Sequence, residues 1–292
     1  MIQEAAGYHS YMRKSVSISP AFTDASSVTR AVDTARAYGP HALIRGAVAY
    51  GAVAALENQT FVKALREAGN TPEHRAQMVD YILANPAYLY QFAGADTAAG
   101  LAREALAPSA LRLHATGRAV RQAAYDIQKQ GWSKSEVADL KGRLAAAEAV
   151  ADGDMPTDPD ELADARKSVA GVSPLPISAA PLAPPYTPMV AHALQLAAIA
   201  ALGEAREDAY DRLSVLTKDD DASNCLAAAK RNFHQCLAVA KPNYEDIFCM
   251  GQHALLDTGV CLARAAGVEP PPEPVPPAPV KKKKTAVRRR HG

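Results

Sequence analysis

Apolar residues recur at helical spacing through most of the chain, and no segment shows the alternation of apolar and polar residues that marks a surface strand. One predicted helix is clearly delimited: Thr71 is placed to cap it, Pro72 occupies its first position, and Pro86 follows its end. Its inward face would hold Met78, Val79, Ile82 and Leu83. The same pattern elsewhere predicts an all-α fold with an irregular multi-helix body.

Two further helices are predicted after residue 108. Residues 109–130 form an amphipathic surface helix, whose apolar stripe consists of Leu113, Val120, Ala124 and Ile127. The pattern Ser133-x-x-Glu136 fits a capping box, so we expect another helix to begin there and to end at Gly153. Its inward residues would be Val137, Leu140, Leu144 and Ala147.

Two segments, residues 46–56 and 189–202, are apolar nearly all round. Neither reaches the roughly 20 consecutive apolar residues that a helix needs to cross a bilayer. We therefore expect no transmembrane segment and interpret both as helices buried in the core. The second begins at Thr187-Pro188, a cap followed by a proline at the first helical position.

Proline content divides the chain into parts. Seven prolines fall between residues 154 and 187, which we interpret as a connection that lies over the surface rather than as a free linker. It would join an N-terminal helical unit, residues 1–153, to a C-terminal helical unit, residues 188–267. Residues 268–292 are predicted to be a disordered proline-rich spacer and a basic tail.

The formal charge of +1 conceals an uneven distribution. Seven of the 32 basic residues lie in the last twelve positions, which leaves 25 basic and 31 acidic residues, a net charge of −6, in the rest. The basic tail consists of Lys281, Lys282, Lys283, Lys284, Arg288, Arg289 and Arg290. We expect it to engage an anionic polymer or lipid surface by charge alone. A purely solubilising terminus is the alternative.

The four cysteines are nested around one turn. Residues 221–240 and 244–266 are predicted helices joined at Pro242. The midpoints of Cys236 with Cys249 and of Cys225 with Cys261 both fall at this turn, so antiparallel helices would place each pair opposite. Cysteines within one helix lie ~16–18 Å apart along its axis, too far for a bond that needs Cα atoms within ~7 Å. We therefore predict the disulfides Cys225–Cys261 and Cys236–Cys249, which staple a helical hairpin.

Three alternatives remain for these cysteines. They could be four free buried thiols, or they could bind a metal, although zinc is disfavoured because no closely spaced cysteine pair occurs. The third is a thiol enzyme, since Cys249, His253 and Asp257 follow one another at i, i+4 and i+8 and match a thiolate, a base and an orienting acid. This hypothesis requires a free Cys249. We expect no catalytic residue, no cofactor and no metal.

Residues 45–53 (RGAVAYGAV), 122–127 (QAAYDI) and 244–253 (YEDIFCMGQH) resemble segments of exported bacterial cell-envelope proteins. The resemblance extends over residues 7–267. Proteins of that kind have no assigned activity, so the resemblance implies export and no particular chemistry. The hairpin is also similar to the paired-cysteine hairpins of small coiled-coil-helix proteins, but its cysteines are separated by ten and eleven residues rather than by nine.

Disulfides are typical of oxidising compartments, which favours a periplasmic or secreted protein. The residues after Met1 lack the basic start and apolar run of a signal peptide, so either an export signal precedes this sequence or the protein is cytoplasmic. We expect a non-enzymatic helical envelope protein with a structural or partner-binding role, its helical body available to a protein partner. The main alternative is a cytoplasmic nucleic-acid-associated protein with a histone-like tail, against which the body's net charge of −6 argues.

Overall fold

The computed structural model describes residues 1–137, 141–142, 145, 155–206 and 209–272, and these contain helices and no strand. The basic tail and the predicted inward residues Leu140, Leu144 and Ala147 lie outside the described part. The all-α prediction is confirmed. In chain order the elements are α1 Ile2–Val16, α2 Ala25–Arg36, α3 Pro40–Ala55, α4 Gln59–Ala68, α5 Pro72–Ala84, η1 Pro86–Gln91, α6 Ala95–Ile127, η2 Trp132–Lys134, α8 Pro159–Val169, α9 Pro188–Ala201, α10 Tyr210–Leu213, η4 Ser214–Thr217, α11 Asp220–Val239, α12 Asn243–Cys249, η5 Met250–Asp257 and α13 Thr258–Ala265.

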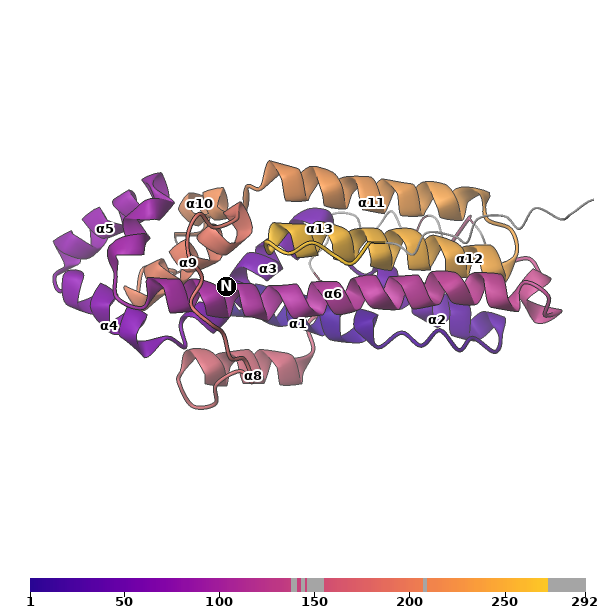
Figure 1. Cartoon of the computed structure of the whole chain (residues 1–292), viewed down its shortest axis with the longest axis horizontal. Helices are drawn as coiled ribbons and strands as arrows, with labels where there is room; N and C mark the ends of the chain where they lie inside the picture. Colours follow the sequence, from indigo (N-terminus) through magenta and orange to yellow (C-terminus); the bar gives the residue numbers. More distant parts are fainter. Residues whose placement is uncertain (138–140, 143–144, 146–154, 207–208, 273–292) are drawn as a thin grey trace, which may run out of the picture.

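Helix α6 runs along the long axis of the molecule (Figure 1). Its 33 residues span ~50 Å, and the predicted start at residue 109 is wrong because the helix continues upstream through Pro108. A proline inside a helix cannot donate to the carbonyl one turn back, here that of Glu104. Packing of α6 against α1, α3 and α9 outweighs this local cost.

Helix α3 lies at the centre of the core. From Ala42 to Ala55 every residue except Arg45 is buried, and the helix contacts α1, α6, α9 and α11. Helix α9 is buried in the same way, with Leu194 and Ile199 at most 1% exposed. Both predictions of buried helices are confirmed. No helix in the described ranges is long and apolar enough to cross a membrane.

The two predicted helical units share one hydrophobic core. Helices α3 and α6 of the first unit both pack against α9 of the second, and α6 also packs against α13. One buried cluster includes residues from Ala5 to Ala266. The connection, residues 154–187, therefore joins two parts of one core and does not separate two independently packed cores.

After α8, this connection continues as an extended segment, residues 173–187, which we call the strap. Leu175 and Ile177 are half-buried against the body, while the prolines between and beside them are exposed. The Leu182 N–H donates to the carbonyl of Asp96 at 2.9 Å. A Cβ atom on Gly100 of α6 would lie 2.2 Å from the carbonyl oxygen of Ala180, so only glycine lets the strap approach α6 this closely.

The predicted capping box at Ser133 and Glu136 is wrong. Ser133 lies in the short turn η2, where its Oγ donates to the carbonyl of Ile127 at 2.6 Å and so closes the end of α6. Glu136 instead forms an isolated bridge with Pro242. This bridge joins the end of α6 to the turn between α11 and α12, a long-range contact that a local sequence pattern does not contain.

Candidate functional site

Two disulfides staple the C-terminal hairpin, as the nested cysteine positions predicted. Helix α11 runs antiparallel to the continuous helix formed by α12, η5 and α13 (Figure 1). The Cα atoms are 5.7 Å apart in Cys225–Cys261 and 5.5 Å apart in Cys236–Cys249. All four cysteines are bonded, so the free-thiol and zinc alternatives are wrong. Among the described residues, no cluster of His, Cys, Asp and Glu is arranged to hold a metal ion.

The structure brings two members of the Cys249, His253 and Asp257 hypothesis together. His253 Nδ1 lies 2.8 Å from Asp257 Oδ2, the contact expected of a base and its orienting acid. The third member fails, because the sulfur of Cys249 is bonded to Cys236 and offers no thiolate. The geometry leaves a histidine–carboxylate pair without the nucleophile that the hypothesis requires.

This pair belongs to a polar chain that ties the hairpin to α6. Gln252 Nε2 donates to the other carboxylate oxygen of Asp257 at 2.9 Å, and Arg121 Nη1 donates to Gln252 Oε1 at 2.6 Å. Gln252, His253 and Asp257 all lie in η5, a π-helical segment that the sequence pattern did not predict. Such segments are often found at functional sites, but here each of these side chains is occupied by a neighbour.

A buried lysine fixes the other face of the hairpin. Lys230 of α11 is 4% exposed, and its ammonium group donates to the carbonyls of Arg36 at 2.7 Å and Tyr38 at 2.9 Å. The same group lies 4.4 Å from the centroid of the Tyr38 ring, and the Tyr38 hydroxyl lies 2.9 Å from Thr258 Oγ1. Burial, with a smaller contribution from the Arg36 charge, lowers the pKa of Lys230 to about 8.

The predicted anion-binding residues, Lys281, Lys282, Lys283, Lys284, Arg288, Arg289 and Arg290, all lie outside the described residues. The last described residues, which follow α13, include the half-buried Pro270 and the exposed Pro271 and Pro272. The basic tail therefore remains a prediction from its charge.

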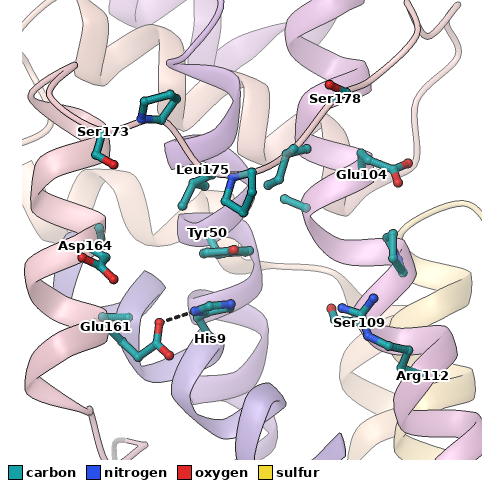
Figure 2. Close-up of a pocket in the computed structure, with 17 residues that line it drawn as sticks. His9, Tyr50, Glu104, Ser109, Arg112, Glu161, Asp164, Ser173, Leu175 and Ser178 are labelled. Carbon is teal, nitrogen blue, oxygen red and sulfur yellow. Dashed lines mark hydrogen bonds and ion pairs between the residues drawn. The ribbon is translucent and has the colours of Figure 1, made fainter.

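A cleft of about 570 Å³ lies between α1, α3, α6, α8 and the strap (Figure 2). Its size falls in the range of small-molecule sites. Helix α1 contributes His9, α3 contributes Tyr50, and α8 contributes Glu161 and Asp164. Helix α6 contributes one wall with Glu104, Ala105, Pro108, Ser109 and Arg112, and the strap covers the cleft with residues 173–178.

One wall of the cleft carries charged side chains that hold one another in place. His9 Nδ1 contacts one carboxylate oxygen of Glu161, and Arg13 Nε contacts the other at 2.6 Å. The His9 ring stacks on Tyr50, with centroids 4.9 Å apart and planes 9° apart. Burial raises the pKa of Tyr50, with smaller contributions from Tyr8, Glu161 and Glu57, so its hydroxyl stays protonated at neutral pH.

The strap is anchored over the cleft by one carboxylate. Glu57 Oε1 accepts from the Leu175 N–H at 2.5 Å and from Ser168 Oγ at 2.8 Å. These bonds fix the end of α8 and the start of the strap to the body. The apolar side chains of Leu175 and Ile177 are thereby held against the cleft.

The residues of this cleft carry no local sequence pattern, so the cleft was not predicted. His9 and Glu161 are 152 positions apart, so no motif spacing could pair them. The useful signal lay in the strap, where Leu175 and Ile177 alternate with prolines and indicate one apolar face that packs on the body.

No protein-family model matches this chain, and no curated protein or solved structure matches it either. Its function is therefore inferred from its own residues.

Proposed function

We propose that this chain is a non-enzymatic helical protein of a bacterial envelope or another oxidising compartment, where its stapled body presents a binding surface to a protein partner. In this proposal the basic tail engages an anionic polymer or lipid surface. The resemblance to exported envelope proteins supports the same compartment.

The hairpin is the observation that carries this proposal. Both disulfides have their Cα atoms at distances suited to the bond, and together they use all four cysteines. Disulfides of this kind persist outside the reducing cytosol, so they are compatible with a periplasmic or extracellular location. The bond to Cys236 also removes the thiolate on which the enzyme hypothesis depended.

Charge separation supports a role for the tail. Seven positive charges lie within the last twelve residues, whereas the preceding 280 residues carry a net charge of −6. Seven prolines among residues 269–280 favour an extended spacer, which at ~3.1 Å per residue could hold the tail up to ~37 Å from the body. Each basic residue contributes ~1 kcal/mol near an anionic lipid surface.

Two truncations test the tail. A chain that ends at Gly267 lacks spacer and tail, and a second chain that ends at Val280 keeps the spacer and lacks only residues 281–292, which contain the basic residues. Both should melt at the temperature of the full chain and lose its salt-sensitive retention on vesicles containing phosphatidylglycerol. If all three proteins are retained equally at low salt, the tail is not a binding element. Retention on duplex DNA but not on vesicles would favour the nucleic-acid alternative.

The compartment is tested separately on protein from its natural source. Its intact mass should be lower than that of the reduced protein by about four hydrogens, because each disulfide removes two. Four thiols that react with an alkylating reagent without denaturation would overturn the assignment to an oxidising compartment.

A further inference from the structure

The cleft contains a cation that nothing in the described part of the chain neutralises. Arg112 has neither a hydrogen-bond nor an ion-pair partner among the described residues. Its guanidinium group extends from α6 into the cleft, toward the wall that carries His9 and Tyr50 (Figure 2). Guanidinium groups bind carboxylates through two parallel hydrogen bonds, so an unpaired one facing a cavity favours such a ligand.

The opposite wall offers hydrogen-bond donors to the same anion. The Tyr50 hydroxyl stays protonated at neutral pH, and the charge of Arg112 acts on it across the cleft. Nδ1 of His9 is engaged by Glu161, which leaves Nε2 on the cleft side, where it can donate when the ring is protonated (Figure 2). Ser109 is not part of this set, because its hydroxyl donates to the carbonyl of Leu106 at 2.9 Å.

The carboxylates around the cleft limit the charge of the ligand. Glu161 is paired with His9 and Arg13, and Asp164 is paired with Lys167 at 3.0 Å. Glu104 has no partner among the described residues and lies two helical turns, ~12 Å, from Arg112. Because the cleft has one unpaired cation and three carboxylates, it suits a ligand with a single negative charge better than a phosphate dianion. Repulsion by Glu104 favours binding of that charge at the other end of the cleft, beside Arg112.

Apart from Ser173 and Ser178 of the strap, the rest of the lining is apolar. Ala105 and Pro108 come from α6, Ala6 comes from α1, and the strap supplies Leu175 and Ile177. A ligand whose charge is held at Arg112 would therefore bury an apolar body under the strap.

We propose that this cleft binds a small organic monocarboxylate, with its carboxylate on Arg112 and Tyr50 and its apolar body against Pro108 and the strap. This binding site is independent of the tail and of the compartment, and so goes beyond the proposed function.

Calorimetric titration of the full chain with hexanoate tests this site. A ligand this small binds with a Kd on the order of 1 mM, so the titration extends to about 10 mM. Hexanol tests the apolar body without the charge, and inorganic phosphate tests the charge without the body. We expect saturable binding of hexanoate and at least about tenfold weaker binding of both other probes.

Variants assign the binding to the cleft. Arg112→Gln should weaken hexanoate binding by about tenfold or more, whereas Arg103→Gln, on the same helix but outside the cleft, should leave it unchanged. Tyr50→Phe keeps the ring that stacks on His9 and should weaken binding by a smaller factor. Arg112 is exposed, and circular dichroism should show that its variant folds. The proposal is overturned if hexanoate does not bind saturably, if hexanol binds as tightly, or if Arg112→Gln and Arg103→Gln bind alike.

Discussion

Gly117 of α6 and Gly251 of η5 face each other with no side chain between them. A Cβ atom on Gly117 would lie 2.8 Å from the carbonyl oxygen of Gly251, and one on Gly251 would lie 3.0 Å from the carbonyl oxygen of Gly117. Both distances are below those of ordinary van der Waals contacts. The central helix and the hairpin therefore touch backbone to backbone, at the point where the hairpin helix is π-helical.

Gly117→Ala should be strongly destabilising, because its Cβ would lie 2.3 Å from the backbone nitrogen of Leu256 and the two helices would have to separate. We expect a loss of about 3 kcal/mol or more in the free energy of unfolding, measured by urea titration. Gly131→Ala is the matched control, since Gly131 has helical φ and ψ and open space around its Cβ position. It should be neutral or stabilising by ~0.5 kcal/mol. Equal stability of the two variants would contradict the close contact of α6 with the hairpin.

Each disulfide should stabilise the protein by an amount that grows slowly, as the logarithm of the length of the loop that it closes. Cys225–Cys261 closes 36 positions and Cys236–Cys249 closes 13. In the chain-entropy model, replacing the first pair by alanines costs ~4 kcal/mol and replacing the second costs ~3 kcal/mol. The measurement is urea unfolding of both double variants beside the reduced and the oxidised wild-type protein. A loss below ~1 kcal/mol for either pair would mean that the hairpin holds its geometry without that bond.

The buried Lys230 should make stability depend on pH. Its pKa is about 8 in the folded protein, below the ordinary value of 10.5, so between these values the unfolded chain binds more protons than the folded one. Stability from this group is therefore fully present above pH 10.5 and is lost as the pH falls through 8. Relative to Lys230→Met, the wild-type protein should gain ~2–3 kcal/mol between pH 7 and pH 10.

The comparison for Lys230 is best made by urea unfolding of both proteins at each pH up to 10. Above that, buried tyrosines such as Tyr8 and Tyr38, whose pKa burial raises to about 12, lower the stability of both proteins as the unfolded chains ionise. The difference between the proteins cancels this contribution. Parallel pH profiles would show that the Lys230 ammonium group is not desolvated as its contacts imply.

Local signals in the sequence were sufficient for much of the fold. Thr71 and Thr187 cap α5 and α9 as predicted, each accepting a bond from a backbone N–H three residues on. The disulfides followed from cysteine spacing, because a helical hairpin with a short turn has only one register that brings both pairs together. In each case the residues that define the feature are neighbours in the chain or are related by helix geometry.

The features that escaped prediction depend on distant partners. The predicted start of this helix at residue 109 was wrong, because packing on three other helices outweighs the hydrogen bond that Pro108 cannot make. Ser133 and Glu136 matched a capping box, but Ser133 bonds backward to Ile127 and Glu136 pairs with the distant Pro242. The cleft joins α1 to α8 across some 150 positions, so its charges come together only in the folded chain.

The packing of the hairpin on α6 also sets the order in which the molecule can be completed during synthesis. The face of α6 that carries His114 and Gly117 packs on Gly259 and Gly251, so it finds its cover only when residues 243–265 have left the ribosome. Until then this face is exposed, a state in which growing chains are prone to aggregate or to recruit chaperones. Because each disulfide joins a cysteine of α11 to one in residues 243–265, oxidation can lock the hairpin only after this last segment has emerged.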